Sequence, residues 1–275
     1  ILGSAVVLRL IIIAADFGTL HFGQKLLEKL KLPAHNIFWY ILNPFIIIEL
    51  TGNLHFEGVM IFFLLWSLYL LHSGMWKLAA VVFACSVSIK LIPLLFLPLF
   101  YEWFTKRETS TKLKITKLMS FYAIVGTTTI LLFLPFYSSQ FVSNYAETVG
   151  LWFKNFEFNA SLYYIAREIG YAITGYNEIA IIGTITAIIV FLFVVALAFF
   201  RKNSSMTQLI TAMLVALSFY YFTATTVHPW YVATLLILSI FTKYKFPLVW
   251  SFAIILSYLA YLQIGNANKS ENLWI

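Results

Sequence analysis

Long apolar runs alternate with short polar stretches along this chain of 275 residues. The main runs cover residues 5–15, 59–71, 118–135, 179–200, 209–227 and 246–261. Runs of roughly 18–20 apolar residues are typical of transmembrane helices. The pattern therefore predicts an all-α fold, a polytopic bundle of transmembrane helices.

Composition supports this fold class. The chain is 61% hydrophobic and 11% charged, whereas a soluble domain has about 25% charged residues. These values exclude a soluble core, a disordered chain and a coiled coil. The single cysteine, Cys85, lies in an apolar run, so we interpret it as a small buried hydrophobic residue.

The net charge of +7 does not indicate a nucleic-acid partner, because the basic residues gather in short loops. These loops cover residues 25–31, 77, 106–117, 201–202 and 243–245, and the positive-inside rule places them in the cytoplasm. Helices connecting them give about ten membrane segments, two or three of them short. We expect one transmembrane domain over residues 1–275, in a bacterial inner membrane.

One region breaks this alternation. Lys77 and the 106–117 loop both belong in the cytoplasm, yet a single apolar run separates them. A hairpin of two short helices, bent near Lys90 and Pro93, resolves the conflict, because proline costs about 3 kcal/mol inside a helix. Lys90 then lies at the outer tip or in a watery cavity.

With this topology, the unusual polar groups all fall on the extracytoplasmic side. They are Asn53, His55, Glu57, Lys90, His228 and the segment 138–178. Ionisable groups at a membrane boundary indicate a functional site by default.

The external segment 138–178 is too polar to span the membrane and too apolar to lie free in water. Asn159 or Ser161 marks the start of a helix that runs to about Thr174, with an apolar stripe of isoleucines at positions 165, 169 and 173. We expect interfacial helices that form a wall or lid beside the site; a simple connector is the alternative. Arg167 is a candidate partner for a phosphate.

Four stretches together resemble bacterial membrane mannosyltransferases of the GT-C superfamily: "IFWYILNPFIIIELTGNLHFEGVMIFFLLWSLYLL", "SVSIKLIPLLFLPLF", "FEFNASLYYIAREIGYAITGYN" and "VHPWYVATLLILSIFTKYKFPLVWSF". The resemblance implies a sugar, most simply mannose, moved from a polyprenyl-phosphate donor to a glycan or lipid-glycan acceptor outside the cytoplasm. In such families an Asp in the first external loop is typically catalytic. The only aspartate here, Asp16, is mid-helix, so we expect a fragment whose catalytic loop precedes Ile1.

The transfer requires a base for the acceptor proton, cations or donors for the departing phosphate, and a groove for the lipid tail. Glu57 and His55 are the catalytic candidates. The substrate-binding candidates are Asn53, Glu49, Lys90, Arg167, His228, Trp230 and Tyr231.

Each candidate also has a structural interpretation. Asn53 and Glu57 can cap a helix hairpin, Glu49 can be buried and protonated, and Lys90 can extend to the surface. Glu49, Asn53 and Glu57 share one face of an unbroken helix, which Gly52 makes uncertain.

The sequence contains no phosphate-binding loop, dinucleotide fingerprint or metal-ligand spacing. We therefore expect neither a cofactor nor a metal. A transporter or flippase of lipid-linked sugars is the alternative function, favoured by the broken hairpin at Lys90. A scaffold subunit is a third possibility, but it would need none of these carboxylates.

Overall fold

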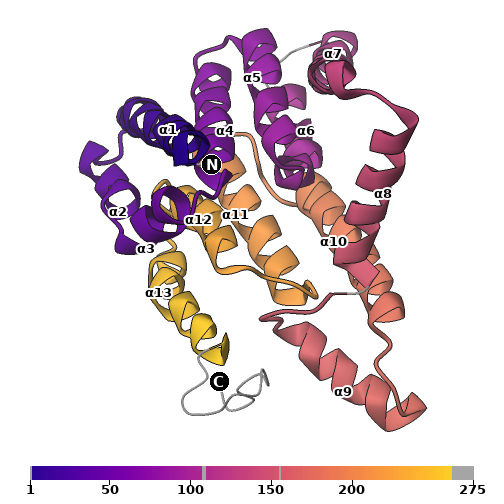
Figure 1. Cartoon of the computed structure of the whole chain (residues 1–275). Helices are drawn as coiled ribbons and strands as arrows, with labels where there is room; N and C mark the ends of the chain where they lie inside the picture. The colour runs from indigo at the N-terminus through magenta and orange to yellow at the C-terminus, as the bar shows by residue number, and fades with distance from the viewer. Residues whose placement is uncertain (1, 107–109, 155, 262–275) are drawn as a thin grey trace.

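The computed structural model of the chain describes residues 2–106, 110–154 and 156–261 (Figure 1). The protein is 82% helical and has no strand within these residues. An isolated bridge pairs Phe158 with Thr226. The predicted all-α bundle is confirmed.

The N-terminal part contains two long helices and a series of short ones. In chain order they are α1 (Leu2–Lys29), η1 (Ala34–Ile37), α2 (Phe38–Ile41), α3 (Pro44–Ile46), η2 (Ile47–Gly52), α4 (Glu57–His72), α5 (Trp76–Ile89), η3 (Ile92–Leu99) and α6 (Phe100–Thr105). The element η2 is a π-helix and the other η elements are 3₁₀-helices.

The remaining elements include three helices of 18 or more residues. They are α7 (Thr111–Phe133), η4 (Leu134–Phe136), α8 (Ser139–Lys154), α9 (Leu162–Thr174), α10 (Ile179–Phe200), α11 (Met206–Thr223), η5 (Pro229–Tyr231), α12 (Val232–Ser239), α13 (Phe246–Ala253) and η6 (Ile254–Tyr261).

Several of these helices are suited to a membrane. Four are long and apolar enough to cross it, or five if the bent pair 44–52 and 57–72 counts as one span. Shorter apolar helices cover residues 76–89, 92–105, 229–239 and 246–259. The predicted segments thus correspond to helices, but the count of ten crossings stays a prediction.

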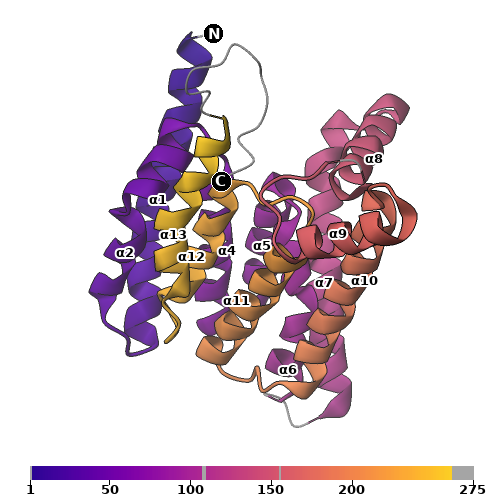
Figure 2. The ribbon, with the colours of Figure 1, turned by 90° about the horizontal axis from the view of Figure 1, so that it is seen from below.

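The helices differ in how deeply they are packed. In the most apolar window of α11, 67% of the residues are buried, whereas the value is 17% for α1, α10 and the span 112–136. Helix α11 is therefore central. The other three present apolar faces outward, as helices in contact with lipid do. Figure 2 shows α1 and α13 on one side of the molecule and α8, α9 and α10 on the other.

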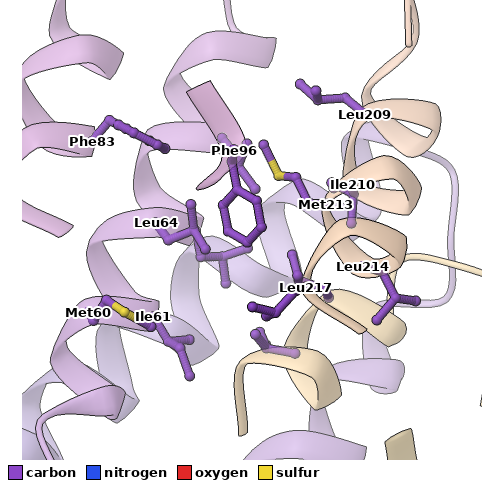
Figure 3. Close-up of a cluster of buried hydrophobic side chains, with 14 of the residues drawn as sticks. Met60, Ile61, Leu64, Phe83, Phe96, Leu209, Ile210, Met213, Leu214 and Leu217 are labelled. Atoms are coloured by element: carbon purple, nitrogen blue, oxygen red, sulfur yellow. The ribbon is translucent and has the colours of Figure 1, made fainter. Parts of the chain in front are cut away.

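The core lies between α4, α5, η3 and α11. Figure 3 shows side chains from these four elements converging, among them Leu64, Phe83, Phe96 and Met213, all at most 1% exposed. Because lipid tails are as apolar as these side chains, close packing holds the helices together inside a membrane. Truncation of such a side chain to alanine costs about 2–5 kcal/mol.

Two glycines shape the helices near the site. Helix α1 packs against α4, and a β-carbon at Gly18 would collide with the ring of Phe62. Helix α9 ends where predicted, at Thr174, because Gly175 adopts a left-handed conformation with φ of 81°.

Candidate functional site

A sharp turn at residues 53–56 starts the candidate site. It joins η2 to α4, whose axes differ by 112°. Leu54 has a positive φ of 60°, which is uncommon for a residue other than glycine. The turn ends the helix at Gly52, so Glu57 does not continue the face shared by Glu49 and Asn53.

The end of η2 is held by helix α1. Arg9 donates hydrogen bonds to the carbonyl oxygens of Thr51 and Gly52, at 3.0 and 3.1 Å. Thr51 Oγ1 donates to Asp16 Oδ2 at 3.2 Å. These contacts satisfy backbone groups that a helix end leaves without partners. Arg9 and Asp16 thus bind the same π-helix rather than each other.

Glu49 is a buried carboxylate on η2, 1% exposed. It accepts hydrogen bonds from Tyr258 Oη at 2.9 Å and from Asn53 Nδ2 at 3.4 Å. Nε2 of His55 lies 4.0 Å from the same oxygen. The structure therefore brings three predicted site residues together, with Tyr258 from the far end of the chain.

Glu57 and Lys90 form an ion pair at the first turn of α4. The Glu57 side chain is 1% exposed, and that of Lys90 is 29% exposed. Lys90 has an extended backbone at the break between α5 and η3, which frees its side chain from either helix. Its Nζ also lies 5.6 Å from the ring centre of Tyr231. The break predicted near Lys90 is present.

Three rings stack beside this pair. The indole of Trp230 lies between the imidazoles of His55 and His228, with centroid distances of 3.7 and 4.4 Å and interplanar angles of 20° and 6°. Both faces of the indole are covered, so Trp230 has only its ring edge left for a substrate. The ring of Tyr231 packs edge-on against His228 at 5.4 Å.

Both imidazoles are neutral near pH 7. Burial lowers the pKa of His55 to about 4, with further lowering by Lys90 and then by His228. Burial and Lys90 likewise lower the pKa of His228 to about 4. Each ring therefore offers one hydrogen-bond donor and one acceptor.

A pocket of about 610 Å³ opens next to Lys90. Lys90 and Tyr231 lie at its edge, and its wall comes from η3, α10, α11 and the loop 224–226. Apolar side chains make up most of that wall, for example Leu94, Leu95, Ala187, Val190 and Phe191. The pocket suits a ligand with a charged head and an apolar tail.

Arg167 lies elsewhere, in α9. Its Nη1 donates to Glu157 Oε1 at 2.6 Å, its Nη2 donates to Glu168 at 3.0 Å, and its guanidinium lies 4.7 Å from the ring centre of Tyr164. It is not among the residues that line the pocket. The structure thus joins Glu49, Asn53, His55, Glu57, Lys90, His228, Trp230 and Tyr231 in one cluster and leaves Arg167 in another.

Sequence reasoning missed Tyr258 and Glu157. Tyr258 ends an ordinary apolar run, and Glu157 is one of several acidic residues in the external segment. Neither carries a local signal that marks its partner. Within the described residues, no group of three or more His, Cys, Asp and Glu side chains is arranged to hold a metal ion.

Comparison with known families identifies the N-terminal part. Residues 1–106 match the model of an alpha-(1->6)-mannopyranosyltransferase N-terminal domain. These residues resemble a mannosyltransferase. The resemblance seen in the sequence is confirmed there, and the match is consistent with a membrane enzyme of the GT-C type. Neither the curated proteins nor the solved structures gave a match.

The matched region covers Glu49 to Lys90 of the site, whereas His228, Trp230 and Tyr231 lie beyond it. The mannosyltransferase match and the helices able to span a membrane support a membrane glycosyltransferase.

Proposed function

We propose that the protein moves mannose from a polyprenyl-phosphate donor to a glycan or lipid-glycan acceptor on the extracytoplasmic face of a bacterial inner membrane. One observation carries the proposal: Lys90, held by the buried Glu57, lies where a polar cluster meets a large apolar pocket. A lipid phosphate needs both features side by side, a cation for its head and an apolar cavity for its tail.

The reaction assigns a task to each part of the cluster. The acceptor oxygen bonds to the anomeric carbon of mannose, the bond from that carbon to the phosphate oxygen breaks, and the lipid phosphate leaves. Lys90 stabilises the negative charge on that phosphate, as preorganised cations do in transfer reactions. Glu57 orients Lys90 through their ion pair.

The acceptor proton needs a base near the sugar. His55 and Glu57 are this chain's candidates, as the sequence predicted. A neutral imidazole at His55 can accept a proton directly or bind a hydroxyl group, and His228 offers the same chemistry on the other side of Trp230. The edge of Trp230 and the side chain of Asn53 complete the polar side of the proposed sugar site.

The lipid bilayer is the second proposed partner. Helix α10 carries exposed isoleucines and phenylalanines along its length, including Ile181, Ile185 and Phe191. Leu162, Ile165, Ile169 and Ile173 of α9 are also exposed, on the predicted stripe. These faces support contact with acyl chains and with the outer interface.

A pocket-filling variant tests the proposal. We expect purified protein to discharge polyprenyl-phosphate-mannose, and Ala187→Phe to reduce discharge of the long-chain donor about tenfold or more because the ring occupies the tail pocket. A donor with a short tail should be much less affected. Ala180→Phe, on the exposed side of the same helix, is the matched control. Equal loss with both donors would contradict the tail assignment.

A flippase of lipid-linked sugars is the second candidate, since the chain is broken at Lys90 within an apolar segment. Reconstituted vesicles separate the two functions. Movement of the intact lipid-linked sugar across the bilayer, with no free lipid phosphate formed, would favour the flippase.

A further inference from the structure

Residues 156–159 connect α8 to α9 as an extended stretch beside the loop 224–228. Phe158 N donates to the carbonyl of Thr225 at 3.0 Å, and Val227 N donates to the carbonyl of Phe158 at 2.9 Å. Two side chains add to this ladder: Thr226 Oγ1 donates to the carbonyl of Phe156 at 2.9 Å, and Asn159 Nδ2 donates to that of Val227 at 3.2 Å. We name residues 156–159 the strut.

The strut faces two ways, because side chains alternate along an extended chain. Phe156 and Phe158 pack near the ring of His228, with centroid distances of 6.1 and 5.4 Å. Glu157, between them, reaches α9 instead. One side of the strut therefore contacts the ring stack and the other contacts the external helix.

Three donors converge on the Glu157 carboxylate. They are Tyr163 Oη at 2.5 Å, Arg167 Nη1 at 2.6 Å and Asn177 Nδ2 at 3.1 Å. Tyr163 is in the first turn of α9, Arg167 is in its middle, and Asn177 lies beyond its end. A single side chain thus fixes the whole helix relative to the strut.

The charge state of Glu157 agrees with this role. Burial raises the pKa of the carboxyl, but the hydrogen bonds from Tyr163, Arg167 and Asn177 outweigh burial and lower it overall. The group stays ionised at neutral pH, and charge-assisted hydrogen bonds are the stronger kind.

The loop held by the strut forms part of the site. Thr225 and Thr226 line the pocket, and His228 is the outer ring of the stack on Trp230. We propose that Glu157 is a positioning residue, which through the strut fixes the pocket rim 225–228 where the lipid-phosphate donor binds. This inference rests on the proposed function for its ligand, while the mechanical link stands on the hydrogen bonds alone.

The test compares two identical substitutions in the external segment of the full chain. Glu157→Gln removes the charge that gathers the three donors. Glu147→Gln makes the same change at an exposed position of α8, outside the network. Hydrogen exchange at the amides of Phe158 and Val227 measures the strut, and steady-state discharge of polyprenyl-phosphate-mannose measures its effect on catalysis.

We expect Glu157→Gln to speed exchange at both amides and to raise KM for the donor at least about fivefold, with kcat within about twofold, because the rim is displaced while the reacting groups remain. Glu147→Gln should change none of these values. A purely structural role would instead lower the active fraction, and so kcat, at constant KM. Unchanged exchange at Val227, or faster exchange with unchanged KM, would overturn the proposal.

Tyr163→Phe gives the same test with a smaller change, should Glu157→Gln fail to fold. It removes one donor to Glu157 and keeps the buried ring. We expect a smaller rise in KM in the same direction, and none would overturn the proposal. If wild-type protein discharges no donor, the proposed function fails, and the exchange measurement still decides whether Glu157 holds the rim.

Discussion

Two buried glutamates pair with lysines at opposite ends of the segment 90–106. Glu57 binds Lys90, which is distant in sequence, whereas Glu102 binds Lys106 one turn further along the chain. The carboxylates are similarly buried, at 1% and 6% exposed. The lysines differ, with side-chain exposures of 29% for Lys90 and 58% for Lys106.

Their surroundings explain the difference. Glu102 also accepts a hydrogen bond from the backbone N–H of Asn203, which ties α6 to the loop between α10 and α11. Arg201 reinforces that loop by donating to Asn203 Oδ1 and to the carbonyl of Gln208. Lys90 instead faces a pocket. A buried carboxylate–lysine pair therefore points to a binding site only when its cation also reaches an open cavity.

Removing each lysine gives the largest contrast. We expect Lys90→Met to lower donor discharge by about 10²-fold or more, because the phosphate loses its cation. Lys106→Met should change it less than about twofold, since an exposed ion pair contributes little. Steady-state assays on detergent-purified protein check both. Similar losses would show that the two pairs do not differ in kind.

Changing the second glutamate should reverse the contrast. Glu102→Gln is expected to destabilise the fold by about 2–3 kcal/mol, because the variant loses a charged acceptor for the Asn203 N–H and for Lys106. Activity per folded molecule should stay near that of wild type. Thermal unfolding combined with the discharge assay checks this, and a stable but inactive Glu102→Gln would contradict it.

Two stacked tryptophans extend the comparison on a smaller scale. Trp230→Leu should cost about 1 kcal/mol of stacking and lower discharge roughly tenfold. Trp250 stacks on Phe222 at 5.1 Å away from the cluster, so Trp250→Leu should lose similar stability with little loss of activity. Equal activities of the two variants would separate the ring stack from the site.

Acid should weaken the site region slightly. His55 and His228 have folded-state pKa values of about 4, below the unfolded value, so the unfolded chain binds more protons between about pH 6.5 and 4. Stability is full above that window and falls as the pH drops through it, by on the order of 1–2 kcal/mol at pH 5.

The charged groups that face these rings are Lys90, Glu49 and Glu57. His228→Phe should flatten the pH dependence of thermal unfolding measured between about pH 7 and 5. The same change at exposed His35 should not.

The sequence predicted much of the helical framework, because local patterns decide it. The run 179–200 lies between Glu178 and the Arg201–Lys202 pair, and α10 has those bounds. Lys90 and Pro93 marked a break that the structure contains, and the isoleucine stripe of α9 is exposed as its spacing predicted.

The pairings could not be predicted, because they join distant segments. Glu57 meets Lys90, Glu49 meets Tyr258, and Phe158 meets the loop at Thr225. Nothing in one apolar run states which other run lies beside it. Arg167 shows the same limit: its charge marked it as a phosphate partner, and the structure gives it two carboxylates instead.

The π-helix at Ile47–Gly52 makes the site sensitive to chain length as well as to residue type. A π-turn carries one residue more than the α-turn it replaces. Deleting a residue there would restore ordinary winding and rotate the downstream turn at residues 53–56 by about 100°. His55 would leave its place on the indole although every side chain of the cluster was still encoded. Shortening this segment by one residue should therefore harm the protein more than most single substitutions within it.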